Sequence, residues 1–264
     1  MLRYSEASGL FILLFFATGC QPLPLGSLNR VHPTPQKQRV GTVYLIRGWR
    51  DLYSEGIDQL ANQLEQANVS APVFRASQWR DLSSAIAQQY TSAAQPEPLI
   101  LVGFSYGADD VLRIAHELQS KNISIDLAIT IDPVTPPSAP RNVKQCINYY
   151  ESNGVWDIFP WLRGIPLETK NSDTKLLNQN LRTDRKDLLE PNTSHATIAG
   201  NLKLHREILR RILEVCRNRP QSFTPARPPA ITPGDEGAGP AAAVGNHSGR
   251  LLGAGDAHGL QSQS

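Results

Sequence analysis

Ser105 is the residue in this sequence whose surroundings most clearly suggest chemistry. It lies in Gly103-Phe104-Ser105-Tyr106-Gly107, after an apolar run and before a segment with helical spacing. Gly-x-Ser-x-Gly at such a junction is typical of a tight strand-to-helix turn that lifts the serine hydroxyl above a sheet. Side chains in place of the glycines would meet neighbouring backbone. A free hydroxyl is a poor nucleophile near neutral pH, so the pattern predicts a nucleophilic serine that needs a general base.

Of the six histidines in the chain, His195 is the best placed to be that base. It lies in the polar loop 192–196, after the last predicted strand and before the last predicted helix. There it could accept the serine proton and return it to a leaving group. The other five lie in terminal segments or within predicted helices: His32, His116, His205, His247 and His258.

A carboxylate should orient the imidazole of His195, and two aspartates are candidates. Asp132 follows the strand predicted at 125–131, and Asp157 follows the strand predicted at 143–150. We favour Asp132 because its strand is better defined, with Asp157 as the alternative. For an oxyanion hole we expect the backbone N–H groups of Tyr106 and of Trp49, which follows the first predicted strand.

Strands and helices alternate between residues 40 and 218. Apolar runs predict strands at 43–46, 73–75, 99–102, 125–131 and 143–150, and helical spacing predicts helices at 55–66, 82–90, 108–118 and 202–215. The alternation predicts a single α/β domain, a mainly parallel sheet with helices on both faces. Ligands of such folds bind at the carboxyl ends of the strands, where the residues singled out above are expected.

The region of about 41–216 resembles the α/β-hydrolase superfamily, and within it small bacterial lipase- and thioesterase-like hydrolases. The motifs that carry the resemblance are the serine turn at 103–107, Ile131-Asp132-Pro133 and Ser194-His195. The resemblance implies a serine hydrolase that cleaves carboxylic esters or thioesters through an acyl-enzyme on Ser105. It implies no metal and no organic cofactor.

Three departures from the superfamily pattern accompany this resemblance. Phe104 stands where the superfamily often has His, and Arg47-Gly48 replaces a His-Gly pair. The chain is also short before its first predicted strand, so a reduced version of the fold is expected. An alternative hypothesis is a catalytically inactive hydrolase-fold lipoprotein that serves as an envelope binding or scaffold module, because a fold does not fix a function.

The N-terminus is predicted to be a targeting segment. Residues 1–19 carry Arg3, an apolar run at 10–16 and small residues just before Cys20, which together resemble the lipobox signal of bacterial lipoproteins. The resemblance implies cleavage before Cys20, lipidation of Cys20 and export to the bacterial cell envelope. Gln21 after the cysteine favours the outer membrane, facing the periplasm. Residues 20–39 are then a Pro-rich tether, and the Pro/Gly-rich residues 219–264 are expected to be a disordered tail.

Composition narrows the remaining classes of function. The chain has 264 residues and a net charge of +2, which argues against a nucleic-acid partner. None of its apolar runs reaches the roughly 18 residues that a membrane-spanning helix needs. The Cys and His spacings resemble no zinc site, and Cys146 and Cys216 could form a disulfide after export. The apolar side chains between 155 and 165 could line an acyl pocket.

Overall fold

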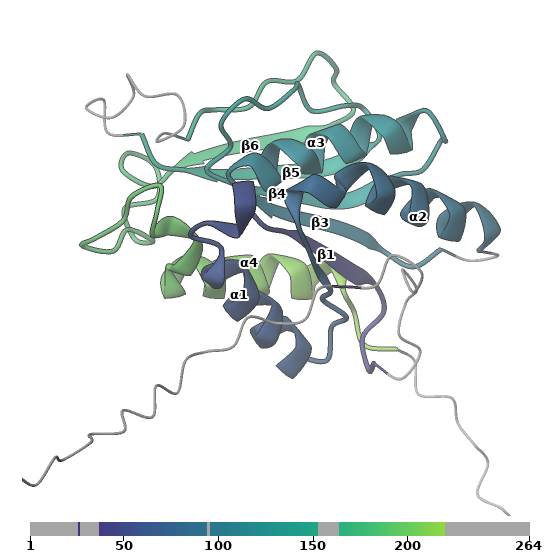
Figure 1. The fold of residues 1–264 in the computed structure, drawn as a ribbon, viewed down its shortest axis with the longest axis horizontal. Helices are drawn as coiled ribbons and strands as arrows, with labels where there is room; N and C mark the ends of the chain where they lie inside the picture. The colour runs from purple at the N-terminus through teal and green to yellow at the C-terminus, as the bar shows by residue number, and fades with distance from the viewer. Residues whose placement is uncertain (1–25, 27–36, 94–95, 153–163, 220–264) are drawn as a thin grey trace, which may run out of the picture. The chain divides into compact units, whose positions relative to one another are not determined.

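The computed structural model describes residues 26, 37–93, 96–152 and 164–219, which form a six-stranded sheet flanked by helices (Figure 1). The strands are β1 (Thr42–Ile46), β2 (Val73–Phe74), β3 (Leu99–Phe104), β4 (Ile125–Ile131), β5 (Val143–Tyr150) and β6 (Lys175–Asn180). The α-helices are α1 (Glu55–Gln66), α2 (Trp79–Ser92), α3 (Tyr106–Gln119) and α4 (Leu202–Val215). Short 3₁₀ helices are η2 (Trp49–Asp51), η3 (Ala76–Gln78) and η5 (Ile198–Gly200).

All neighbouring strands pair in parallel, in the order β2-β1-β3-β4-β5-β6. The register sets Ile46 opposite Gly103, and Phe104 opposite Ile131, so β1, β3 and β4 end at the same edge of the sheet. The chain proceeds from β1 outward to β2, and then from β3 in the opposite direction. This reversal between β1 and β3 opens the crevice in which ligands of open parallel sheets bind.

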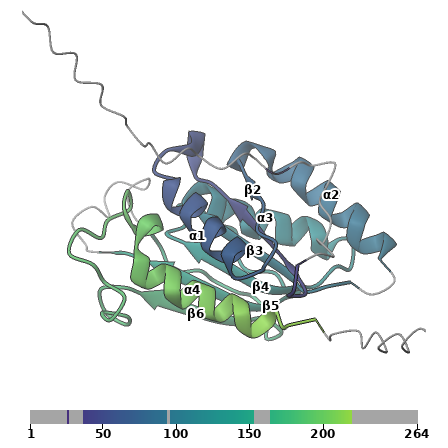
Figure 2. The ribbon, with the colours of Figure 1, turned by 90° about the horizontal axis from the view of Figure 1, so that it is seen from below.

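Helices cover both faces of the sheet. Helices α1 and α4 pack on one face, and α2 and α3 pack on the other (Figures 1 and 2). Side chains of β1 alternate between the two faces, with Val43 and Leu45 toward α1 and α4, and Tyr44 and Ile46 toward α2 and α3. A central parallel strand is buried on both sides, and this is why β1 and β3 are continuous apolar runs in the sequence.

The predicted α/β class is correct, and most predicted elements are present close to their predicted bounds. Helix α2 begins at Trp79 rather than Leu82, and α3 begins at Tyr106 directly after the serine. Strand β6 was missed, because Lys175–Asn180 is mainly polar. It is an edge strand whose residues are only partly buried or exposed, so its sequence carries no apolar run.

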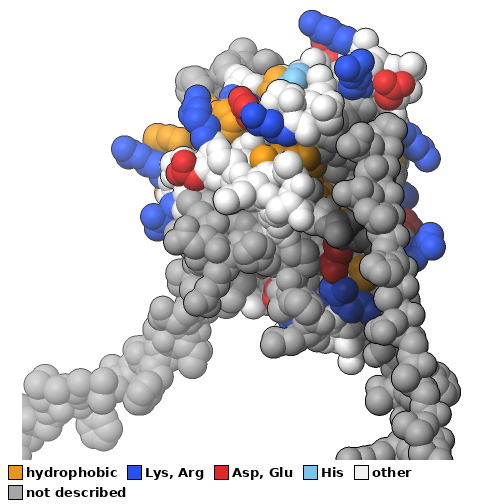
Figure 3. Space-filling model, turned by 90° about the vertical axis from the view of Figure 1, so that its right-hand side faces the viewer, with side chains coloured by type: hydrophobic (Ala, Val, Ile, Leu, Met, Phe, Trp, Pro, Cys, Tyr) orange, Lys and Arg blue, Asp and Glu red, His pale blue; other side chains and the backbone are white. Residues whose placement is uncertain are grey.

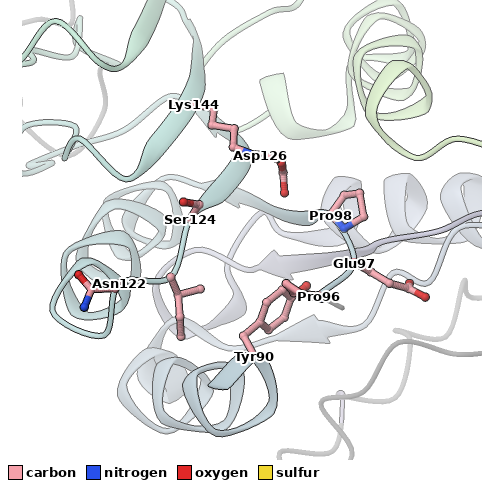
Figure 4. A pocket seen from close by; sticks show the side chains of 9 residues that line it. Tyr90, Pro96, Glu97, Pro98, Asn122, Ser124, Asp126 and Lys144 are labelled. Carbon is pink, nitrogen blue, oxygen red and sulfur yellow. Dashed lines mark hydrogen bonds and ion pairs between the residues drawn. The ribbon is translucent and has the colours of Figure 1, made fainter. Parts of the chain in front are cut away.

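The sheet edge opposite the serine has its own cavity, of about 330 Å³ (Figure 4). Its charged side chains have partners within the fold: Lys144 Nζ lies 2.7 Å from Asp126 Oδ1, and Glu97 Oε2 accepts from the Gly41 amide at 2.8 Å. On the side of the domain where α2 and α3 end, basic and acidic side chains lie interspersed (Figure 3). Among the residues that the structure describes, no helix is both long enough and apolar enough to cross a membrane.

Candidate active site

Ser105 lies on the turn between β3 and α3, with φ 55° and ψ −124°. A positive φ is strained for a serine, and such strain is found where the surrounding structure enforces it. A Cβ on Gly103 would collide with the backbone of Gly107, and a Cβ on Gly107 would collide with the carbonyl oxygen of Arg47. The two glycines therefore allow β3, α3 and the loop after β1 to approach closely enough to hold this turn.

The imidazole of His195 lies directly against Ser105. The distance from Ser105 Oγ to His195 Nε2 is 3.0 Å, and both side chains are buried. The ring of His195 packs beside that of Phe104, with centroids 5.3 Å apart. His195 comes from the loop between β6 and η5, so residues ninety positions apart meet at one edge of the sheet.

Asp132 lies on the other side of the same imidazole. The distance from His195 Nδ1 to Asp132 Oδ2 is 2.7 Å, and the Asp132 side chain is completely buried. An ionised carboxylate only accepts hydrogen bonds, so Nδ1 carries the proton that it donates to Asp132. Nε2 is then free to accept the hydroxyl proton of Ser105, which is the arrangement that a general base requires.

The second oxygen of the Asp132 carboxylate is held by backbone. The N–H of Glu151, just after β5, donates to Asp132 Oδ1 at 2.7 Å. Asp132 itself has φ 52°, and a Cβ on Gly164 would collide with its carboxylate. The carboxylate is therefore enclosed closely from several sides, which fixes the oxygen that faces His195.

Two polar side chains connect the loops that carry Ser105, His195 and Asp132. Arg182 forms an ion pair with Glu151 and also donates to the carbonyl oxygen of Thr193 at 3.2 Å, which links the segment beside Asp132 to the loop of His195. Asp109 accepts from the amides of Val134 and Thr135, both at 2.9 Å, and so holds the loop after β4. Burial raises the pKa of Asp109, and these hydrogen bonds oppose the rise.

Sequence reasoning missed both of these positioning side chains. Asp109 lies in the first turn of α3, where an acidic residue is common without any special role, and Arg182 carried no signal in the sequence. The contacts join segments far apart in the chain, and the partners become visible only when the loops are assembled.

The loop after β1 is held by a buried ion pair that the sequence did not reveal. Arg47 binds the Asp58 carboxylate with three hydrogen bonds of 2.9–3.0 Å, from Nε and Nη2. Burial raises the pKa of Asp58, and the hydrogen bonds and charge of Arg47 oppose that rise. The Gly48 amide donates to Ser54 Oγ at 3.0 Å, so it is already occupied. Trp49, the next residue, lines the same cavity as Ser105 and Tyr106.

A cavity of about 470 Å³ opens at Ser105, and we call it the serine cavity. It is lined by Trp49, Leu52, Tyr53, Phe104, Ser105, Tyr106 and His195. Three of its apolar side chains, on the loop after β1, are more than half exposed, which is unusual for groups of this size. Within the described residues, the amides of Trp49 and Tyr106 at this cavity donate no hydrogen bond. The cavity can therefore accept an apolar group while leaving polar N–H groups near the serine.

Some of the residues singled out in the sequence fall outside the part of the chain that the structure describes: Asp157, most of the apolar segment 155–165 and Cys20. The remaining described histidines have other partners: His116 Nε2 lies 2.8 Å from the carbonyl oxygen of Ser138, and His205 Nε2 lies 2.6 Å from that of Ala199. Among the described residues, no group of three or more His, Cys, Asp or Glu side chains could hold a metal ion.

The disulfide considered between Cys146 and Cys216 is not formed. Both side chains are buried free thiols. Cys146 is on β5 and packs toward α2 and α3, whereas Cys216, at the end of α4, packs in the core on the opposite face of the sheet. The sheet separates the two sulfur atoms, and burial raises the pKa of each thiol to about 12.

Neither a scan against protein families nor a search of curated proteins finds a match to this sequence. Solved structures with a related arrangement include Est1E from Butyrivibrio proteoclasticus, with 10% identity, a TM-score of 0.44, and coverage of 69% of this chain and 90% of that one. A putative hydrolase of the alpha/beta superfamily from Xanthomonas campestris pv. campestris has 12% identity, a TM-score of 0.40, and coverage of 67% and 99%. An α/β serine hydrolase without a lid, from Xanthomonas campestris, has 17% identity, a TM-score of 0.39, and coverage of 71% and 88%.

Proposed function

We propose that this chain is an exported serine hydrolase that cleaves carboxylic esters or thioesters through an acyl-enzyme on Ser105. The observation that carries the proposal is the continuous row of hydrogen-bonding atoms from Ser105 Oγ through His195 to Asp132, with separations of 3.0 Å and 2.7 Å. A buried serine, histidine and aspartate in this order form the arrangement that activates a hydroxyl for acyl transfer.

In the proposed reaction, Ser105 Oγ attacks the carbonyl carbon while its proton passes to His195 Nε2. The imidazolium formed in this way is stabilised by the Asp132 carboxylate at Nδ1. His195 then returns the proton to the departing alcohol or thiol, and the acyl group stays on Ser105. Water then attacks the acyl carbon while it gives a proton to His195 Nε2. The bond between that carbon and Ser105 Oγ breaks, His195 passes the proton to Oγ, and the acid leaves, which restores the serine.

The negative charge that develops on the carbonyl oxygen needs N–H donors near Ser105. The amides of Tyr106 and Trp49 are our candidates, because both residues line the serine cavity and the Gly48 amide is occupied by Ser54. The buried ion pair between Arg47 and Asp58 would hold the Trp49 side of this hole in place. Loss of one such donor typically costs about 2.7–4 kcal/mol of transition-state stabilisation.

The apolar lining of the serine cavity favours an acyl or alkyl group as the part of the substrate bound there. Phe104, Leu52 and Tyr53 would contact that group. Esters with a short or medium aliphatic chain are therefore the substrates with which to begin.

The test is labelling of the purified protein by a fluorophosphonate probe, which reacts only with an activated serine. We expect labelling of the wild type and its loss in Ser105→Ala and His195→Ala. Ser194→Ala is the matched control, because this exposed serine lies beside His195 and its hydroxyl contacts only Thr197 among the described residues. A folded wild type that takes no label and hydrolyses no ester would instead favour the catalytically inactive envelope lipoprotein considered from the sequence.

We further propose that the protein is anchored to a bacterial membrane through lipidated Cys20, on the basis of the apolar run at 10–16 and the small residues just before this cysteine.

 The test is expression in a bacterial host with radiolabelled palmitate, beside Cys20→Ser. We expect the label and membrane retention in the wild type, and neither in the variant. A wild-type protein that is secreted without lipid would overturn the anchor while leaving the proposed chemistry intact.

A further inference from the structure

A second cavity, of about 340 Å³, lies next to the serine cavity, and we call it the arginine groove. Its charged lining comes from the side chains of Arg50, Asp51, Arg75, Arg80, Asp110 and Arg113. Four arginines thus face two aspartates around one hollow. Such an excess of positive charge attracts anions, and a concave site concentrates its effect.

Only two of the four arginines are neutralised by the aspartates. Arg75 Nε lies 2.8 Å from Asp51, and Arg113 Nη1 lies 2.6 Å from Asp110. Within the described part of the chain, Arg50 and Arg80 have no carboxylate within 4.0 Å. The groove is therefore lined by four arginines against two aspartates, and among the described residues Arg50 and Arg80 form no close ion pair.

These two guanidinium groups are held over aromatic rings. Arg50 Cζ lies 5.0 Å from the centroid of the Trp49 ring, and Arg80 Cζ lies 4.3 Å from that of Trp79. Stacking of this kind restrains an arginine and leaves the N–H groups at its edge available. A carboxylate or a phosphate matches that edge, because its oxygens can accept two parallel hydrogen bonds.

The arginine groove adjoins the proposed reaction site. Trp49 and Tyr106 line both the groove and the serine cavity. A substrate with its carbonyl group at Ser105 could therefore extend one end among apolar side chains and the other among arginines. The cavity at the opposite edge of the sheet offers no such site, because the carboxylates of Glu97 and Asp126 line it.

We propose that the arginine groove binds an anionic group, a phosphate or a carboxylate, of the ester or thioester whose apolar part enters the serine cavity. This inference rests on the proposed function and narrows its substrate class to anionic amphiphilic esters.

The test compares three butyryl esters of phenols: para-butyryloxybenzoate, the corresponding aryl phosphate, and the neutral methyl ester of the benzoate. The measured quantity is the ratio of kcat/KM for each anionic ester to that for the neutral ester. Intrinsic reactivity cancels when this ratio is compared between the wild type and a variant. The variants are Arg50→Gln and Arg80→Gln, and the matched control is Arg141→Gln, an exposed arginine before β5 and away from the groove.

We expect the ratio to fall by roughly three- to fivefold in each groove variant, because an exposed ion pair contributes modestly. The change should appear mainly in KM, as expected for a contact made equally in the bound substrate and in the transition state. The control should leave the ratio unchanged. A larger fall for the phosphate than for the carboxylate would identify the preferred anion. Ratios that stay equal in all variants would overturn the inference while leaving the proposed hydrolase function intact.

A binding measurement separates this inference from a failure of the proposed function. Ser105→Ala would be titrated with para-butyryloxybenzoate while the tryptophan fluorescence is followed, since Trp49 and Trp79 line the groove. Saturable binding that weakens when Arg80→Gln is added supports the groove even if no ester is hydrolysed. Absence of binding, or binding that Arg80→Gln does not change, overturns it.

Discussion

Replacement of Asp132 by asparagine tests the proposed mechanism most directly. The Glu151 N–H donates to Asp132 Oδ1 at 2.7 Å, so the oxygen of the new amide must take that position. The amide NH₂ group then faces His195 Nδ1, where the wild type has the accepting oxygen Oδ2. A donor at this place favours the tautomer with its proton on Nε2. That tautomer cannot accept the proton of Ser105.

We expect kcat to fall because the hydrogen bond between residue 132 and His195 is reversed in this way. Asparagine at the orienting position of a serine–histidine–aspartate arrangement lowers kcat by about 10⁴-fold, which corresponds to about 5 kcal/mol in the activation barrier. The fold should tolerate the change, because asparagine has the same shape and removes a buried charge. Rates of fluorophosphonate labelling and ester hydrolysis would be measured beside thermal unfolding, with the exposed Asp173→Asn as matched control.

Labelling and hydrolysis rates of Asp132→Asn within tenfold of the wild-type rates would refute this reasoning. Asp157→Asn distinguishes the alternative considered from the sequence. Loss of activity in that variant, with activity retained in Asp132→Asn, would assign the orienting role to Asp157 instead.

Three further predictions concern residues that stabilise the serine turn, the loop after β1 and helix α4. Gly107→Ala should abolish fluorophosphonate labelling and lower the melting temperature, because the added Cβ would collide with backbone. Gly200→Ala is the control and should change neither quantity, because a Cβ there would have nothing within 4 Å. A Gly107→Ala variant that remains active would contradict the proposed turn. Asp58→Asn should lower the free energy of unfolding by about 3 kcal/mol in urea titrations, because it removes the carboxylate that lies 2.9 Å from buried Arg47, whereas that of Asp51 lies 3.9 Å away. A loss below about 1 kcal/mol would show that the other partners of Arg47 suffice. Burial by itself would raise the pKa of Glu207, but hydrogen bonds from Arg210 and Arg211 of α4 lower this pKa to about 2. Its carboxylate therefore stabilises the fold fully above pH 4.5, and this contribution is lost progressively as the pH falls toward 2. Glu207→Gln should cost about 2 kcal/mol at pH 7 and less than half of that, about 0.8 kcal/mol, at pH 3; an equal cost at both pH values would contradict the assignment.

The fold and the serine turn were largely predictable because their signals are local. A central parallel strand is buried on both faces, so β3 is apolar throughout, and the amphipathic spacing of α4 reflects a single buried face. The glycines at 103 and 107 are needed because a Cβ at either position would collide with backbone, and this requirement is visible within five residues of sequence. Strand β6 was missed for the converse reason, since an edge strand needs little apolar surface.

Which side chains meet was decided by the tertiary structure. Asp132 and His195 each had a suitable place in the sequence, but their contact depends on the parallel register of β3, β4 and β5 and on the loop that returns from β6. The same assembly placed Cys146 and Cys216 on opposite faces of the sheet, where no disulfide can form.

The sequence by itself determined the class of fold, the position of the serine turn and the order of the candidate residues, because each depends on neighbouring residues. Only the tertiary structure decided the ion pair of Arg47 with Asp58, the enclosure of the Asp132 carboxylate and the arginine groove beside the serine cavity. Those features join separate segments, and their geometry follows from the packing of loops at one edge of the sheet rather than from any local pattern of residue types.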